Sequence, residues 1–144
     1  PYLASPVETL DQIADNQNRH RDQLPEQSDY PLSLVMRTVF VSQDENELVR
    51  VREELDQEMK GRRENMPAAV RTALEAPLAE RAIIGTTSEV LESLKATHAK
   101  IGFDLLIVRP QFARVADDPL EESLTLLTEE VWPALLESVS AATE

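Results

Sequence analysis

The sequence predicts an α/β protein built on a parallel sheet, and three observations support that prediction. Short runs of β-branched and large apolar residues alternate with longer segments in which apolar residues recur at helical spacing. The connections between these runs are long enough to hold a helix, as parallel pairing requires. The chain has 144 residues, of which 42% are hydrophobic, so it can form the core of one ordinary domain.

The predicted strands comprise two clear and two weaker runs. The clear ones are 34-LVMRTVFV-41 and 105-LLIV-108, and the weaker ones are 2-YLA-4 and 82-AII-84. The run at 105–108 shows no apolar–polar alternation, which predicts a strand buried on both faces.

Helix starts are marked by a small polar residue with Glu three positions later, a pair that can cap free backbone N–H groups. This pattern occurs at 5-SPVE, 44-DENE, 86-TTSE and 118-DPLE. Ser5 and Asp118 also precede a proline, which suits the first helical position. We expect the second helix to end at Gly61 and the third at Gly102, and we expect Pro133 to kink the last helix or to start a new turn.

The segment 61-GRRENMPAAVRTALEAPLAE-80 fits the alternation poorly, because it holds two prolines and begins with two arginines. We interpret it as an inserted, lid-like loop within a single partial domain spanning residues 1–144. Four strands cannot close a parallel barrel, which needs eight. The chain therefore fits either part of a larger barrel or the core of a small layered domain, and a first residue of Pro1 instead of Met fits a processed or truncated piece.

The composition excludes several classes of partner. The formal charge of −13 should repel nucleic-acid phosphates and anionic lipid surfaces, so we expect neither nucleic-acid nor membrane binding. No apolar run approaches the roughly 18 residues of a membrane span, and no basic-then-apolar leader opens the chain. The absence of cysteine argues against disulfides and thiolate metal sites and favours a cytoplasmic location, and we expect no metal site.

Familiar catalytic motifs are missing from the sequence. Three glycines are too few for the usual glycine-rich phosphate loop, and neither a GxSxG nor an HExxH pattern occurs. Carboxylate pairs such as Asp117/Asp118 lie at helix starts, where the helix dipole favours them. We expect His98 to lie at a helix C-terminus and His20 to be solvated.

Two arginines leave alternatives open. Arg37 interrupts an otherwise apolar strand, so its cation must reach a carboxylate, a ligand or solvent. Arg109 follows a strand at its carboxyl end, where parallel α/β folds build their sites.

Three stretches, in order, resemble one family. They are 37-RTVFVSQDENEL, then 83-IIGTTSEVLESL followed by 102-GFDLLIVRP, and finally 121-EESLTLLTEEVWPALL. Their order and spacing are similar to the C-terminal portion of the luciferase-like monooxygenases, and the resemblance covers most of residues 34–136. The chain departs from the family at Thr87, where proline is usual, and no glycine-rich stretch accompanies the insertion at 61–80.

The resemblance implies the last three strands of a (β/α)8 TIM barrel that binds reduced FMN, or the deazaflavin F420, and oxidises a small organic substrate with O2. It also implies a homo-oligomer and supply of reduced flavin by a flavin reductase. By position, Ser5, Ser42 and Arg109 would contact the cofactor, and Gln43 and Gln111 would also face the site. Arg62, Arg63 and Arg71 would belong to the lid. No residue is identified as catalytic.

The first five strands, which carry most flavin contacts in that family, have no counterpart in the 144 residues. We therefore expect this piece to be inactive alone. The alternative is a non-catalytic, acidic α/β interaction module whose apolar faces dock a partner.

Overall fold

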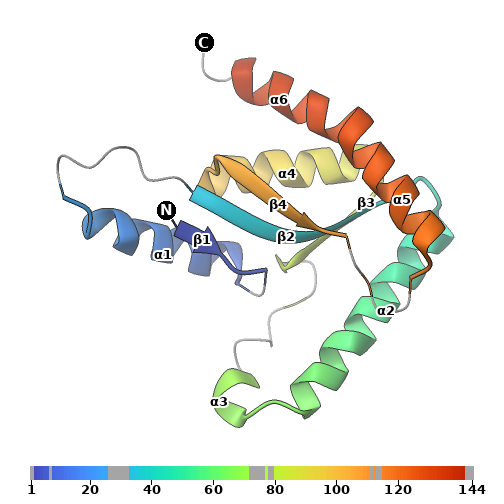
Figure 1. Ribbon diagram of the computed structural model, residues 1–144, viewed down its shortest axis with the longest axis horizontal. Coiled ribbons are helices and arrows are strands. Elements are labelled where there is room, and N and C mark those ends of the chain that lie inside the picture. The colour runs from blue at the N-terminus through green and yellow to red at the C-terminus, as the bar shows by residue number, and fades with distance from the viewer. Residues whose placement is uncertain are drawn as a thin grey trace.

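The computed structural model describes residues 2–6, 8–25, 33–71, 77, 80–110, 112 and 115–141, and it confirms the α/β class (Figure 1). Strands form at all four predicted places. The elements, in chain order, are β1 (Tyr2–Ala4), α1 (Leu10–Asp22), β2 (Ser33–Val41), α2 (Glu45–Glu64), α3 (Ala68–Arg71), β3 (Ala82–Gly85), α4 (Thr87–Ile101), β4 (Leu105–Arg109), α5 (Asp117–Leu126), a π-helical turn (Leu127–Val131) and α6 (Trp132–Ala141).

The sheet is open, fully parallel and centred on β2. Val35 pairs with both Ala4 of β1 and Leu106 of β4, so these two strands lie on opposite edges of β2. Strand β3 pairs with Thr38–Val41, on the same edge as β1 but further along. The sheet therefore has β1 and β3 in succession on one side of β2 and β4 on the other.

One face of the sheet is covered by helices. Alternate residues of β2 point into this layer, where α1, α4 and α6 pack over them. The fully buried side chains include Val35, Val39 and Val41 of β2 together with Leu94 of α4. This layer holds most of the hydrophobic core.

Among the described residues, helices cover the opposite face only near the carboxyl end of β2. There Phe40 packs against Leu48 and Val51 of α2 and makes an edge-to-face contact with Phe112, with ring centroids 5.6 Å apart. Nearer the amino end, Leu3, Leu34 and Leu105 lie in one register row. Leu3 is 55% exposed and Leu105 is 51% exposed. We call this row and the neighbouring Met36–Ile107 pair the open face.

This open face corrects one sequence prediction. Strand β4 is not buried on both faces, because Leu105 and Arg109 are exposed and the three residues between them are only partly buried. The lack of alternation in 105-LLIV-108 therefore does not reflect burial within the chain.

The start of α1 also differs from the prediction. Ser5 does not cap the helix; instead Glu8 N donates to Ser5 O (3.2 Å) and Ser5 N donates to Glu8 Oε2 (2.6 Å), which closes a separate turn. The helix begins after Thr9, whose side chain forms a capping box with Gln12. Val7 lies outside the described residues.

Two further helix boundaries need correction. Helix α2 runs through Gly61 and ends at Glu64, so Arg62 and Arg63 lie in its last turn. Helix α5 begins at Asp117 after Ala116, which makes no side-chain cap, so Asp118 is not the N-cap. Pro133 lies in the first turn of α6, directly after the π-helical turn, as expected of a residue that cannot donate to the preceding turn.

The turn from β3 into α4 forms as predicted. Thr86 and Glu89 make a capping box, and Gly102 ends the helix with φ of 55°, a value that favours glycine. Gly85 makes room for the cap, because a Cβ there would lie 2.7 Å from Glu89 Oε2. None of the described helices combines the length and apolar character needed to cross a bilayer.

Candidate functional site

The structure places the three predicted cofactor residues at different heights along the sheet. Ser5 follows Ala4, which pairs with Val35, whereas Ser42 follows Val41, six residues further along β2. At about 3.3 Å per residue, these positions are about 20 Å apart along the strand direction. Arg109 pairs with Thr38 and lies about a third of the way from the level of Ser5 to that of Ser42. Because β1, β2 and β4 end at different levels, Ser5, Ser42 and Arg109 do not lie together around one site.

Ser42 is buried and already has partners. Its hydroxyl donates to Glu47 Oε2 (2.6 Å) and accepts from Asp44 N (3.0 Å). It borders a shallow hollow whose other lining residues are Gln43, Asp44, Glu45, Glu47 and Glu122. The carboxylates make this hollow unfavourable for a phosphate. The hydrogen bonds of Ser42 instead stabilise the start of α2.

Of the predicted lid arginines, Arg62 and Arg63 lie in the last turn of α2, and Arg71 lies on α3. Figure 1 shows this end of α2, and α3 beyond it, away from the sheet. Arg62 forms an ion pair with Glu58, and Arg71 Nη2 donates to Met66 O (3.1 Å) from α3. At 1.5 Å per residue, α2 places Arg62 and Arg63 roughly 30 Å from its first turn, beside which Ser42 lies. Gln111 and most of 72–80 lie outside the described residues, and the lid remains a prediction.

Arg37 is the buried cation that the sequence singled out. It is 1% exposed, which excludes the solvent alternative, and its Nη1 donates to Ser5 O (3.3 Å). Burial lowers the pKa of Arg37, and the Glu8 carboxylate partly opposes this effect. Among the described residues Arg37 makes no direct ion pair.

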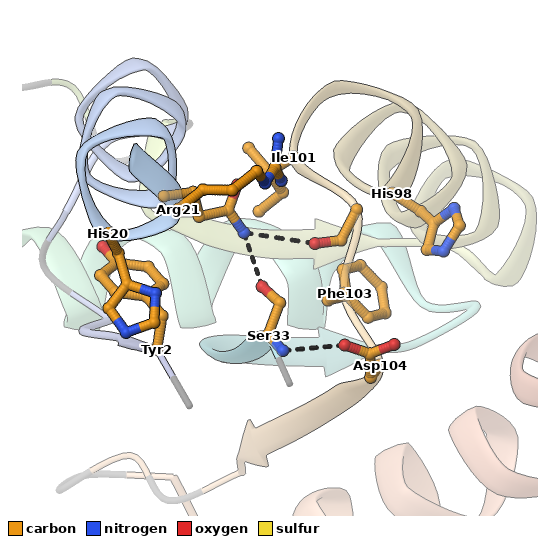
Figure 2. Close-up of a pocket in the computed structure, with 10 residues that line it drawn as sticks. Tyr2, His20, Arg21, Ser33, His98, Ile101, Phe103 and Asp104 are labelled. Carbon is orange, nitrogen blue, oxygen red and sulfur yellow. Dashed lines mark hydrogen bonds between the residues drawn. The ribbon is translucent and has the colours of Figure 1, made fainter. Parts of the chain in front are cut away.

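The structure also brings together residues that are far apart in sequence, around a cavity of about 430 Å³ at the amino end of the strands (Figure 2). His20 from the last turn of α1 and His98 from the last turn of α4 line opposite sides of it. His98 thus lies at a helix end as predicted, whereas His20 is only partly exposed and its ring centroid is 6.2 Å from that of Tyr2.

The polar groups of this cavity mainly tie neighbouring segments together. Gln17 Nε2 donates to Ser33 Oγ (2.6 Å) and to Gly102 O (3.3 Å), and Ser33 N donates to Asp104 Oδ2 (2.8 Å). Figure 2 shows these bonds as a chain between the ends of α1 and α4 and the start of β2. These bonds hold the loop before β4 in place. The two imidazoles pack against aromatic rings, His20 against Tyr2 and His98 against Phe103 with centroids 5.0 Å apart, and Arg21 also lines the cavity.

Neither the cavity nor the rest of the described residues gathers three His, Cys, Asp or Glu side chains in a geometry suited to a metal ion. Sequence reasoning missed Gln17 and Asp104, because their partners lie 85 and 71 residues away. One signal could have identified Gln17 as a structural residue: it lies within a polar run but on the buried side of α1.

Comparison with known proteins identifies no relative: no protein-family model and no curated protein matches this sequence. Functional inference therefore depends on the chain's own geometry and on the motif resemblance.

Proposed function

We propose that this chain is the C-terminal part of a (β/α)8 barrel of the luciferase-like monooxygenase type. In this proposal β1, β2 and β4 are the last three barrel strands. The complete protein uses reduced FMN or F420 and O2 to oxidise a small organic substrate in the cytoplasm, and a flavin reductase supplies the reduced flavin. The flavin itself would provide the oxygen chemistry.

The observation that carries the proposal is the open face. A (β/α)8 barrel covers the outer side of its strands with helices and fills the inner side with apolar side chains from the strands. In this sheet α1, α4 and α6 lie on one face, and α2 reaches the other face only beside Phe40. Leu3, Leu34 and Leu105 occupy the amino-end part of that other face, where none of the described helices covers them. A self-contained layered domain would instead place polar residues on such a face.

The strand order supports the same proposal. Successive barrel strands are neighbours, and β1, β2 and β4 are adjacent in that order. Strand β3 is additional to this order and pairs only with the end of β2.

The predicted cofactor residues fit a flavin phosphate unequally. Arg109 is exposed at the carboxyl end of β4 and has a donor fork suited to an anionic group. Ser42 lies beside carboxylates and does not fit one. Three strands do not enclose a dry cavity for a reactive flavin, so in this proposal the 144-residue chain has no monooxygenase activity by itself.

The open face also favours a second candidate, a non-catalytic α/β module that docks a partner through this surface. Flavin binding distinguishes the two candidates. The whole reading frame that contains these residues should be purified, and FMN and F420, oxidised and reduced, should be titrated by absorbance and fluorescence. Saturable binding with substrate-dependent O2 consumption is expected, and a whole protein that binds neither cofactor would refute the monooxygenase proposal.

A further inference from the structure

A second cavity, of about 570 Å³, lies on the helix-covered side between β3 and α4 and is rich in arginine. Arg37 of β2, Arg52 of α2 and Arg81, which precedes β3, all line it, together with one acidic residue, Glu80. In a chain with 14 Lys and Arg against 27 Asp and Glu, three arginines around one cavity run against the overall composition.

The guanidinium of Arg37 has unused hydrogen-bonding capacity. Its Nη2 is buried and has no hydrogen-bond partner in the part of the chain that the structure describes. The Glu8 carboxylate, which attracts it electrostatically, already accepts hydrogen bonds from Ser5 N, Tyr2 OH and Asn16 Nδ2. A buried cationic donor without a partner is costly, and an anion in the cavity would remove that cost.

The other arginines increase the positive charge at the same place. Arg81 is 4% exposed, and its pKa is lowered first by burial and then by the neighbouring charge of Arg63. Arg52 Nη2 donates to Ile84 O (2.9 Å), and Arg52 Nη1 lies 3.9 Å from the exposed carboxylate of Glu45. Several cationic groups that line one cavity favour an anionic ligand within it.

We propose that this cavity binds a small phosphate-bearing ligand, with Arg37 and Arg81 as the principal donors and Arg52 at the rim. Guanidinium groups present paired N–H donors that match phosphate oxygens. The volume falls within the range usual for small-molecule sites, about 300–1,000 Å³. The site is independent of the proposed flavin chemistry, which concerns the opposite face of the sheet.

Isothermal titration calorimetry tests the proposal on the 144-residue chain. Inorganic phosphate and phenyl phosphate are titrated at constant ionic strength, with chloride and sulfate as comparison anions. We expect saturable binding of one phosphate per chain, with chloride unable to replace it. If both phosphate compounds bind, the site recognises the phosphate group; if only phenyl phosphate binds, it recognises an organic phosphate.

Arg81→Met and Arg37→Met should each weaken phosphate binding about ten- to a hundredfold, as expected for loss of a hydrogen bond to a charged group. Arg50→Met is the control, matched to Arg52→Met: like Arg52, Arg50 lies on α2 beside a carboxylate, Glu47, but it does not line the cavity. Where Arg37→Met fails to fold by circular dichroism, Arg81→Met and Arg52→Met decide the question. The proposal is overturned if the unaltered chain binds neither phosphate compound, or if Arg50→Met weakens binding as much as Arg81→Met does.

Discussion

Replacing Leu3 and Leu105 together by serine tests whether the open face is buried when the protein assembles. Each side chain is about half exposed in the isolated chain, 55% and 51% respectively. Complete burial of a leucine contributes about 1.5–3 kcal/mol, so covering the remaining half contributes roughly 1 kcal/mol per side chain. The pair therefore accounts for about 2 kcal/mol per copy, and thus about 4 kcal/mol in a dimer that covers both copies, or about a thousandfold in the association constant.

Sedimentation velocity over a concentration series measures this effect. The unaltered chain should form dimers or larger species, because its open face and the outer edge of β4 are uncovered within the described residues. The double variant should need about a thousandfold higher concentration to form the dimer. Leu136→Ser is the matched control, since Leu136 on α6 is also 51% exposed but lies in the helix layer.

Two results would refute the reasoning. One is an unaltered chain that stays monomeric at every concentration, because a stable monomer does not need its open face covered. The other is a double variant that associates as strongly as the Leu136→Ser control does. Far-UV circular dichroism must show that each variant is folded before either result is interpreted.

Four further predictions concern stability, measured by urea unfolding. Thr86→Ala should cost about 1 kcal/mol through loss of the α4 capping box, whereas Ser88→Ala should have little effect. Gly102→Ala should cost about 1–2 kcal/mol, because its φ of 55° is unfavourable for alanine. Leu94→Ala should cost about 2–5 kcal/mol, since Leu94 is fully buried; a cost as small as that of an exposed leucine would contradict the packing described. Hydrogen bonds from Thr86, first from its backbone N–H, lower the pKa of Glu89, so their contribution is present above the ordinary carboxyl pKa and is lost as pH falls through the lowered one. Glu89→Gln should therefore flatten the acid limb of the stability curve, and an unchanged limb would refute this assignment.

Much of the sheet could be predicted from the sequence, because its signals are local. The strand runs 34–41 and 105–108 are apolar and β-branched, and a helix of sufficient length separates each strand from the next. The caps at Asp44 and Thr86 formed because each side chain reaches an N–H within its own turn.

The failed helix boundaries show where local signals compete. Ser5 and Glu8 did make one of the two hydrogen bonds of a capping box, but Thr9 and Gln12 offered a complete one four residues later. Gly61 did not stop α2, because glycine is tolerated inside a helix at a cost of about 1 kcal/mol. Whether a capping or stop residue sets a helix boundary thus depends on the hydrogen bonds and helix propensity of the residues around it.

The site was less predictable, because it depends on strand register. Placing Ser5 and Ser42 at one edge assumed that β1 and β2 end together, whereas β1 pairs only with the first three residues of β2. Nothing in a three-residue strand specifies how far along a nine-residue partner it will pair. Arg37 was identifiable, because a cation in an apolar run must have a structural or ligand partner.

Strand β2 places its side chains contrary to what an isolated layered domain requires. Arg37 points into the helix layer, where it is 1% exposed, while Leu34 and Met36 point toward the opposite face, in the part that no described helix covers. Each arrangement is unfavourable if the chain is complete in itself, since one buries a cation and the other exposes apolar area. An anion bound beside Arg37 would offset the cost of the buried cation, and an apolar surface placed over Leu34 and Met36 would remove their exposure. An anion cannot cover the open face, and an apolar surface cannot neutralise the arginine. The leucine and arginine variants should therefore act independently: Leu3→Ser with Leu105→Ser should leave phosphate binding unchanged, and Arg81→Met should leave self-association unchanged.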